Sequence, residues 1–304
     1  MALPFIQANT NGRLHAADEP SIAPLNRGFL YGDAIYEVWR THGGVIVTWD
    51  EHYDRLERSA VALHLALPWR RGEMRTQVLR TAAAYRQAAN YTGELYIRVQ
   101  VTRGGGPIGL DVALADRADF VLLVQPCPVN SLAVQQRGLR LSLATGSRRN
   151  PVESLNPAWK TGNYLNNILG LQEARARGAD DVVMLNLRGE VTEASTSNIA
   201  FVGPDGVVTP RLEEGILGGI TRALVLTPIA PAVGVPVREA VVRATELSGM
   251  SECFLMSTTK DISPVTAIDG VNFKVGPETV TARISAAFAD YARQSAAAHP
   301  ELRT

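Results

Sequence analysis

Apolar residues recur along the chain with two periods, that of a strand and that of a helix. This alternation restricts the possible folds more than any other feature of the sequence. Short runs with the spacing of a strand alternate with longer runs with the spacing of an amphipathic helix, without any internal repeat. Prolines and small polar residues break the pattern at residues 127–131 (CPVNS), which we interpret as a linker. The sequence therefore predicts an α+β enzyme-like fold, an α/β layout in two domains.

The length of the chain supports this division. It has 304 residues, 46% of them hydrophobic, which is enough to bury two cores. We expect a small N-terminal α/β domain over residues 1–126, an interdomain linker over residues 127–132 and a larger domain over residues 133–304.

Local patterns predict individual elements on both sides of the linker. The dipeptide Asn11-Gly12 favours a tight turn between two short strands. Helical spacing predicts helices over residues 51–67 and 218–234, and the almost wholly apolar run 119–126 predicts a buried strand.

Charge and targeting signals exclude several classes of protein. The 30 basic and 30 acidic side chains cancel, which argues against binding to nucleic acid or to a membrane surface. No apolar run approaches the roughly 20 residues that span a bilayer, and the N-terminus does not have the pattern of a signal peptide. We expect a cytoplasmic protein in which Cys127 and Cys253 are buried thiols, and no metal site, because the five histidines are scattered.

A glycine-rich stretch at residues 104–109 (GGGPIG) matches the pattern G-x-G-x-x-G of dinucleotide-binding proteins. That motif requires a helix directly after it, so that helical N–H groups meet the pyrophosphate. Here another strand follows, and Pro107 removes one of the amides. We interpret the stretch as a flexible loop between strands.

Lys160 is a candidate nucleophile. Lysine occurs only at positions 160, 260 and 274 in a chain that otherwise uses arginine, and Lys160 lies between an apolar tripeptide and the start of a helix. A desolvated lysine can form a Schiff base with an aldehyde cofactor, whereas a guanidinium stays protonated. We expect Lys160 at the entry turn of this helix rather than on its solvated face, and the alternative is a surface lysine before a helix.

Other residues far along the chain add to this signal. Glu193 is an acid between two strands and needs a cationic or N–H partner, which a pyridinium nitrogen would supply. Glycines before Thr221 at a helix start suit a phosphate, and Thr258 follows a buried strand. Together with the arginines of DRLERSA on the first helix, Arg55 and Arg58, these residues indicate a site for pyridoxal 5′-phosphate.

With these motifs the sequence resembles the class IV aminotransferases, the family of branched-chain and D-amino-acid transaminases and aminodeoxychorismate lyase. The resemblance extends over nearly the whole chain through ordered stretches: RGFLYGDAIYEVWR, HYDRLERSA, YIRVQVTRGG, PAWKTGNYLNNI, GADDVVMLN, VTEASTSNIAF, GILGGITR and FLMSTT. It implies the D-amino-acid aminotransferase-like fold, in which the larger C-terminal domain is β-barrel-like.

The resemblance also implies roles for individual residues. Lys160 would form the Schiff base and shuttle the proton, and Glu193 would keep the pyridine nitrogen protonated. Tyr164 would bind the phenolic oxygen of the cofactor. The residues implied to bind the phosphate are Arg55, Ile220, Thr221 and Thr258. For Arg55 the alternative is an exposed helix residue paired with Asp54 or Glu57.

Substrate selectivity is less clear, because the motifs mix two subtypes. YIR resembles the branched-chain type, whereas EASTSN departs from the EGSGEN of that type and VQVTRGG is similar to the D-amino-acid enzymes. Arg40 or Arg98 would bind a carboxylate, unless they form ion pairs within the strands. The candidate substrate-binding residues are Tyr31, Tyr36, Arg40, Tyr96, Arg98, Thr259 and Lys260.

The sequence thus predicts a transaminase that moves an amino group between an amino acid and a 2-keto acid, most simply of the branched-chain type. The alternatives are a D-amino-acid or (R)-amine transaminase, a pyridoxal-phosphate-dependent lyase of the aminodeoxychorismate type, and a binding protein without catalytic activity. The resemblance further implies a homodimer.

Overall fold

The structure is a computed structural model that describes residues 4–128 and 132–304. The described residues form two compact units, and neither is continuous in sequence. Unit 1 contains residues 4–128, Trp159–Asn163 and Ala292–Thr304, and unit 2 contains residues 132–158 and Tyr164–Tyr291. Part of the predicted linker, residues 129–131, lies outside the described residues.

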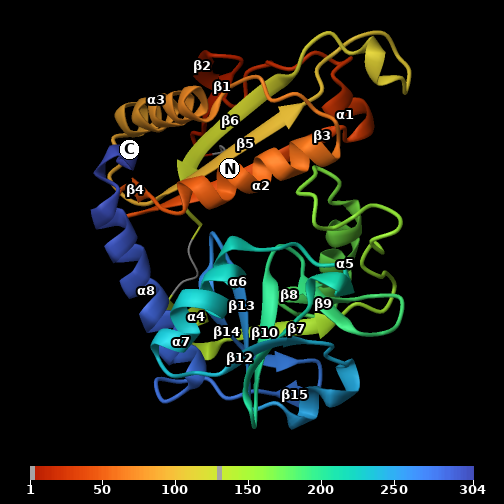
Figure 1. Ribbon diagram of the computed structural model, residues 1–304, viewed down its shortest axis with the longest axis vertical. Coiled ribbons are helices and arrows are strands. Elements are labelled where there is room, and N and C mark those ends of the chain that lie inside the picture. Colours follow the sequence, from red (N-terminus) through yellow and green to blue (C-terminus); the bar gives the residue numbers. More distant parts are fainter. Residues whose placement is uncertain (1–3, 129–131) are drawn as a thin grey trace. The chain divides into compact units, whose positions relative to one another are not determined.

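Unit 1 is built on a six-stranded sheet in the order β2-β1-β6-β5-β3-β4 (Figure 1). Its elements are β1 (Gln7–Thr10), β2 (Arg13–Ala16), α1 (Arg27–Tyr31), β3 (Ala34–His42), β4 (Val45–Ile46), α2 (Trp49–Ala62), α3 (Arg71–Ala89), β5 (Leu95–Thr102), a 3-10 turn (Val112–Leu114), β6 (Asp119–Pro126) and a second 3-10 turn (Pro300–Leu302). The turn between β1 and β2 is the predicted one, because Asn11 and Gly12 both have positive φ, 51° and 91°.

One face of this sheet carries the core of unit 1. Buried side chains alternate along β5 at positions 95, 97, 99 and 101, and they pack with apolar residues of α2 and α3, the two helices drawn in orange in Figure 1. The strand β6 lies where it is predicted and alternates in the same way, so it is buried on one face and half-buried on the other. Phe120, Leu122 and Val124 are buried, whereas Val121 and Leu123 are only half-buried.

Unit 2 is built on a curled nine-stranded sheet in the order β12-β11-β10-β13-β14-β7-β8-β9, with β15 paired to β14. Its strands are β7 (Leu139–Leu143), β8 (Asp181–Leu185), β9 (Val191–Ala194), β10 (Asn198–Gly203), β11 (Gly206–Pro210), β12 (Val237–Ala240), β13 (Glu252–Ser257), β14 (Asp261–Ile268) and β15 (Val271–Asn272). The curl brings β9 to the segment after β12, where the Val191 amide donates to the Val242 carbonyl at 2.8 Å. The predicted β-barrel-like domain is confirmed.

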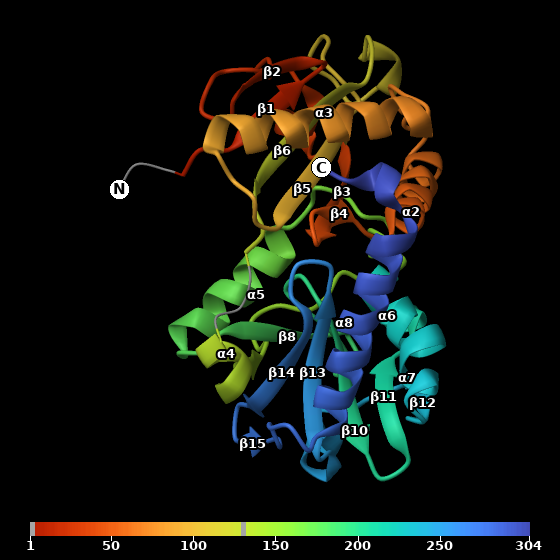
Figure 2. The same cartoon turned by 90° about the vertical axis from the view of Figure 1, so that its left-hand side faces the viewer.

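Helices accompany this sheet. They are α4 (Leu132–Arg137), α5 (Leu165–Ala176), α6 (Ile220–Leu224), a π-helical turn (Val225–Ile229), α7 (Ala230–Ala232) and α8 (Val280–Ala298), together with 3-10 turns at Leu212–Glu214 and Ala244–Gly249. The blue helix α8 in Figure 2 begins at a buried carboxylate, because Glu252 accepts hydrogen bonds from the Val280 and Thr281 amides at 3.0 and 2.8 Å.

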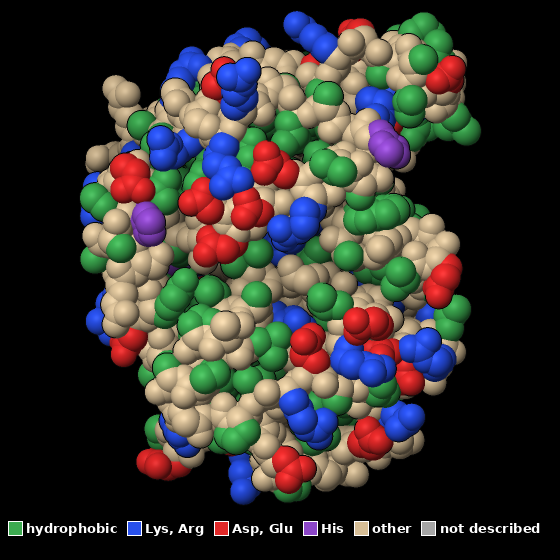
Figure 3. All heavy atoms as spheres, in the orientation of Figure 1, with side chains coloured by type: hydrophobic (Ala, Val, Ile, Leu, Met, Phe, Trp, Pro, Cys, Tyr) green, Lys and Arg blue, Asp and Glu red, His purple; other side chains and the backbone are tan. Residues whose placement is uncertain are grey.

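Within the described ranges, no helix combines the length and apolar character that crossing a membrane requires. Positive and negative side chains are interspersed on the face of the molecule that Figure 3 shows, which fits the balanced composition. Cys127 and Cys253 are buried thiols, as predicted.

Candidate active site

The strand β3 divides its side chains between the two faces of the unit 1 sheet. Glu37 points to the core face, in register with the buried Val99 of β5. Tyr36 and Arg40 point to the opposite face, where β5 places Tyr96 opposite Arg40 and Arg98 opposite Val38. Four of the predicted substrate-binding residues, Tyr36, Arg40, Tyr96 and Arg98, therefore share one face of the sheet.

Lys160 is attached to the free edge of β3. The Tyr36 amide donates to the Lys160 carbonyl at 3.0 Å, and the Gly162 amide donates to the Ala34 carbonyl at 3.0 Å. On the other side, the Lys160 amide donates to Ser59 Oγ of α2 at 3.2 Å. The expectation that Lys160 lies at the entry turn of a helix was wrong, because the helix α5 begins only at Leu165. The backbone of residues 160–162 instead pairs with β3, as a short strand would.

The side chain of Lys160 meets Tyr36. The ammonium donates to the Tyr36 hydroxyl at 3.3 Å and lies 4.4 Å from the centroid of the ring. The Arg98 guanidinium lies 3.8 Å from the same centroid and donates to Gln100 Oε1 at 2.9 Å. An amine and a guanidinium thus lie close to one tyrosine.

Arg55 belongs to a buried network on the core face. Its guanidinium binds both oxygens of Glu37, at 2.6 and 2.9 Å, and His52 Nδ1 donates to Glu37 Oε2 at 2.8 Å. Burial alone raises the pKa of Glu37, but Arg55 and His52 together hold that pKa far below its usual range. Burial lowers the pKa of His52 from its ordinary value, although the Glu37 carboxylate opposes this shift. The alternative of an exposed Arg55 paired with Asp54 or Glu57 is wrong.

Tyr31 lies at a loop rather than beside Lys160. Its hydroxyl accepts a hydrogen bond from the Gly109 amide at 3.2 Å, and the Arg27 guanidinium lies 5.2 Å from its ring centroid. Arg27 also donates to carbonyls of residues 109–111, and Arg27 and Arg103 share the carboxylate of Asp33. The glycine-rich stretch is a loop between strands, as predicted, but Arg27 holds its end, so the expectation of a flexible loop is not met; a 3-10 turn at Val112–Leu114, not an α-helix, follows it.

In unit 2, Glu193 is buried and firmly held. Arg149 Nη2 lies 2.8 Å from Glu193 Oε1, and the other oxygen accepts hydrogen bonds from Asn198 Nδ2 and the Leu217 amide, both at 3.1 Å. The sequence predicts that this acid needs a cationic or N–H partner. The chain itself supplies both kinds, in addition to any ring nitrogen.

The predicted phosphate-binding residues of unit 2 lie at two turns. Ile220 and Thr221 are buried at the start of α6. A Cβ on the preceding residue, Gly219, would lie only 2.0 Å from Asn198 Oδ1. Thr258 lies in the turn between β13 and β14. Asn198 also donates to the Leu217 carbonyl at 2.9 Å, so one side chain fixes the loop and contacts Glu193.

Three further predicted residues lie in unit 2. Tyr164 is the N-cap residue of α5, and Thr259 follows Thr258 in its turn. Lys260 forms an ion pair with the buried Asp181, at 3.2 Å. The structure therefore gives the Lys260 ammonium a structural partner.

The predicted residues thus fall into two groups, one in each unit. Unit 1 holds Tyr31, Tyr36, Arg40, Arg55, Tyr96, Arg98 and Lys160. Unit 2 holds Tyr164, Glu193, Ile220, Thr221, Thr258, Thr259 and Lys260. These side chains fit a pyridoxal cofactor in kind, because they include a lysine amine, a buried carboxylate and hydroxyls beside a glycine that admits no Cβ.

Sequence analysis missed the residues that support these groups. Glu37 had a signal, since a charge at a core-facing position of an apolar strand needs a buried partner. Arg149, Asn198 and Ser59 had none, because their partners lie far along the chain and no spacing indicates them.

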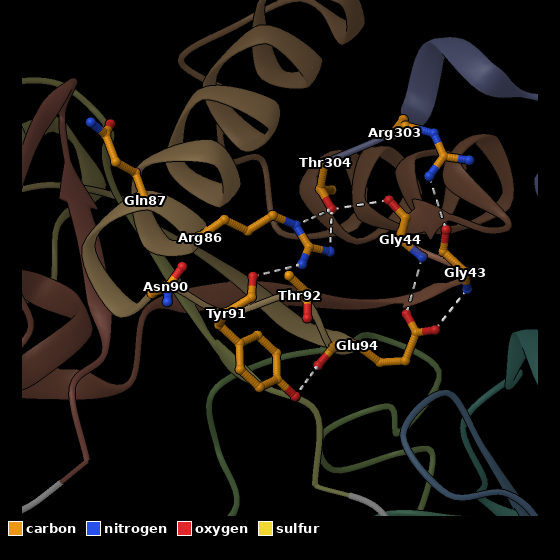
Figure 4. Close-up of a pocket in the computed structure, with 10 residues that line it drawn as sticks. All are labelled: Gly43, Gly44, Arg86, Gln87, Asn90, Tyr91, Thr92, Glu94, Arg303 and Thr304. Carbon is orange, nitrogen blue, oxygen red and sulfur yellow. Dashed lines mark hydrogen bonds between the residues drawn. The ribbon is translucent and has the colours of Figure 1, made fainter.

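A surface pocket of unit 1, of about 510 Å³, contains none of the predicted residues (Figure 4). Its charged side chains form hydrogen bonds with groups of the chain around the pocket. Arg86 donates to the Thr304 hydroxyl at 2.8 Å, and Glu94 accepts from the Gly43 amide at 2.7 Å (Figure 4). The pocket is therefore a junction where the C-terminal residues are attached.

Comparison with known proteins gives a consistent result. A family model described as amino-transferase class IV matches residues 34–268. A putative branched-chain-amino-acid aminotransferase of Methanocaldococcus jannaschii is 34% identical, covering 86% of this chain and 87% of that protein. A D-alanine aminotransferase of Listeria monocytogenes is 33% identical, covering 92% and 94%. The solved branched-chain aminotransferase of Thermoproteus uzoniensis with norvaline superposes with a TM-score of 0.87 at 29% identity, covering 99% of both chains.

Proposed function

The chain belongs to the class IV aminotransferase family, and from this premise we propose that it transfers amino groups between branched-chain L-amino acids and 2-keto acids. It is an aminotransferase that uses pyridoxal 5′-phosphate and acts on amino acids and keto acids. The branched-chain assignment is supported by the relative from Methanocaldococcus jannaschii and by the structure from Thermoproteus uzoniensis.

One observation in the structure carries the proposal. The amine of Lys160 and the guanidinium of Arg98 both lie close to the Tyr36 ring. An amino acid carries an amino group and a carboxylate on one carbon, and a guanidinium binds a carboxylate through two parallel hydrogen bonds. We therefore assign Arg98, rather than Arg40, as the first candidate for the substrate carboxylate, because Arg98 contacts the tyrosine that Lys160 contacts.

The predicted cofactor-binding residues keep their proposed roles. Lys160 carries the cofactor and moves the proton at the substrate Cα, while the Tyr36 hydroxyl orients its amine. Glu193 holds the ring nitrogen, and Tyr164 contacts the phenolic oxygen. The proposed phosphate ligands are Arg55, Ile220, Thr221 and Thr258. The cofactor, when bound, supplies the electron sink, so the tasks of the chain are orientation and proton transfer.

A D-amino-acid transaminase is the second candidate. The D-alanine aminotransferase of Listeria monocytogenes is nearly as similar to this chain as the branched-chain relative. The stretch EASTSN also departs from the branched-chain pattern EGSGEN at residues 194, 196 and 197. The outer residues of that stretch, Glu193 and Asn198, are common to both patterns and contact each other.

A panel of half-reactions distinguishes these candidates. The purified enzyme loaded with its cofactor is mixed with L-leucine, D-alanine, D-glutamate or (R)-1-phenylethylamine, and the loss of cofactor absorbance is followed. We expect rapid loss with L-leucine alone. Loss only with a D-amino acid or with the amine would overturn the branched-chain proposal.

The role of Lys160 has a separate test. We expect Lys160→Ala to abolish the cofactor adduct that borohydride fixes to the wild-type chain, because arginine side chains form no such adduct. Mass spectrometry of the reduced protein measures it, with Lys260→Ala as the matched control that keeps the adduct. An adduct that persists in Lys160→Ala would contradict the assignment.

We further propose a homodimer in the cytoplasm and a domain boundary at residues 127–132. Exposed apolar side chains support self-association, since Phe29, Ile108 and Leu110 in unit 1 are at least 75% exposed. In unit 2, Leu165, Ile168 and Leu169 of α5 are also more than half exposed. Sedimentation at several concentrations tests the dimer, and a monomer at micromolar concentration would refute it.

A further inference from the structure

Arg149 is the charged residue nearest to the acid that is proposed to hold the ring nitrogen. Its guanidinium lies 2.8 Å from Glu193 Oε1, and the two side chains are only 11% and 7% exposed. In such a dry environment an opposite charge at this distance strongly favours the ionised form of a carboxyl group. The two N–H groups on Oε2, from Asn198 and Leu217, favour the same form.

The structure holds Arg149 in this position. Its amide donates to the Leu185 carbonyl at 2.8 Å, which fixes the backbone beside β8. Its guanidinium also reaches Asn167 Oδ1, at 3.4 Å, and Asn167 in turn donates to the Ser195 carbonyl at 2.8 Å. Arg149 Nε is buried and, in the part of the chain that the structure describes, has no hydrogen-bond partner.

That unpartnered Nε is unfavourable for the fold, since a buried donor without a partner is destabilising. A neutral side chain of similar length would avoid this cost. Packing alone does not explain an arginine whose Nε has no hydrogen-bond partner and whose Nη2 faces a buried acid. The arrangement therefore points to a role of the charge itself.

We propose that Arg149 is a positioning residue that keeps Glu193 ionised, so that the proton between Glu193 and the cofactor's ring nitrogen stays on the nitrogen. This inference rests on the proposed role of Glu193. Arg149 lowers the affinity of the carboxylate for a proton, and the proton therefore moves to the competing base, the pyridine nitrogen. The O–H bond of the Glu193 carboxyl group is broken, the N–H bond of the ring is formed, and no other bond changes.

The other charges nearby do not replace that of Arg149. Asp181 accepts a hydrogen bond from the Ser195 amide, two residues after Glu193, but Lys260 neutralises it at 3.2 Å. Arg148, the next residue in the chain, is exposed and donates to carbonyls of its own loop, including that of Ala144 at 3.1 Å. Arg148 is thus a matched control, with the same side chain one position away.

The test follows the ring proton directly. The enzyme is loaded with cofactor labelled with ¹⁵N in the ring, and the ¹⁵N chemical shift is measured against pH for the wild type and for Arg149→Met, Arg148→Met and Glu193→Gln. This shift separates a protonated from an unprotonated ring nitrogen without any turnover. Arg149→Gln is the second neutral variant, for the case that Arg149→Met does not fold.

We expect a protonated ring nitrogen in the wild type and in Arg148→Met. In Arg149→Met or Arg149→Gln, the ¹⁵N shift moves toward that of an unprotonated ring nitrogen at a pH where the wild-type nitrogen is protonated, because a carboxylate that loses an opposite charge binds a proton about 10–1,000-fold more tightly. Arg149→Lys restores part of this shift, because it returns the charge with a shorter reach.

Two results would overturn the inference in different ways. If Glu193→Gln deprotonates the ring nitrogen and neutral variants of Arg149 leave it as in the wild type, Arg149 has only a packing role. If Glu193→Gln itself leaves the ring nitrogen protonated, the role proposed for Glu193 is wrong, and the inference fails with it.

Discussion

Tyr36 is the residue of unit 1 that contacts both Lys160 and Arg98. Its amide binds the Lys160 carbonyl, its hydroxyl accepts from the Lys160 ammonium, and its ring lies against Arg98. The hydroxyl can therefore orient the amine, while the ring positions the guanidinium.

The substitution Tyr36→Phe distinguishes the role of the hydroxyl from that of the ring. The variant keeps the ring but loses the acceptor for Lys160, so we expect kcat to fall by about tenfold or more, given that a positioned proton-transfer group contributes about 10²–10⁴-fold. Steady-state kinetics with the best donor measures it. Tyr91→Phe, which loses a hydroxyl that donates to the Glu94 carbonyl at 3.4 Å, is the control. An unchanged kcat in Tyr36→Phe would show that the hydroxyl plays no part.

His42, at the end of β3, makes the stability of unit 1 depend on pH. Burial lowers the pKa of His42 to about 4, with a further lowering by Arg40, whereas an unfolded histidine has a pKa of about 6.5. Between these values the unfolded chain binds more protons than the folded one, so stability is complete above pH 6.5 and is lost as the pH falls toward 4. Burial shifts the pKa of His52 in the same direction.

We therefore expect His42→Gln to lose less stability in acid than the wild type. Between pH 7.5 and pH 5, the decrease in the free energy of unfolding should be about 1–2 kcal/mol smaller in the variant. Urea unfolding at the two pH values measures this difference. Equal losses in the two proteins would mean that His42 does not titrate in this range.

At the residue scale, the sequence indicates the side chains that are proposed to react but not those that hold them. Lys160 and Glu193 stand out by residue type and context. Arg149 is one arginine among many, and its importance comes only from a contact with a residue 44 positions later. Because such pairs form only after folding, local spacing does not reveal them.

At the scale of elements, most helices and strands could be predicted, and the differences have local causes. The helix predicted over residues 218–234 is interrupted by a π-helical turn at Val225–Ile229, which contains Pro228. A proline has no N–H to donate within a helix, so the regular pattern cannot pass through it. The helix start expected at Lys160 was displaced to Leu165, because residues 160–162 pair with β3 instead.

The loop before α6 provides a prediction at this scale. A Cβ on Gly219 would lie 2.0 Å from Asn198 Oδ1, so Gly219→Ala must displace the side chain that fixes both this loop and Glu193. We expect the dissociation constant of pyridoxal 5′-phosphate to rise about tenfold or more, consistent with the ~1–3 kcal/mol cost of overpacking.

Gly218→Ala is the matched control for this loop. A Cβ at Gly218 would meet only Leu212 Cδ2, at 3.9 Å, which is an ordinary contact. Cofactor titration followed by absorbance compares the two variants. If both bind the cofactor equally well, Asn198 does not transmit the clash at Gly219 to the cofactor site.

At the scale of the whole molecule, the last residues of the chain complete the core formed by the first. Leu302 is 5% exposed and packs in the core of unit 1, and the Thr304 amide donates to the Gly44 carbonyl at 2.9 Å. The family could be predicted from the sequence because many motifs occur in order. The long-range attachment of residues 292–304 could not, since no local pattern indicates a partner so far away.

We expect Leu302→Ala to lower the free energy of unfolding by about 2–4 kcal/mol, the usual cost of a cavity left by a buried leucine. Denaturant unfolding measures this change. Val61→Ala, at a 75% exposed site of the same unit, should change it by less than about 0.5 kcal/mol. A similar, small effect of both substitutions would place Leu302 outside the core.

The segment Trp159–Asn163 has a consequence for recombination between relatives. It belongs to unit 1 although the residues on both sides of it belong to unit 2. A chimera that joins residues 1–128 of one parent to the remainder of another therefore combines the β3 edge of one parent with the lysine segment of the other. If residues 159–163 are exchanged together with β3 and Ser59, the groups that form the hydrogen bonds around Lys160 all come from a single parent. We expect chimeras of this kind to be enriched among the active ones.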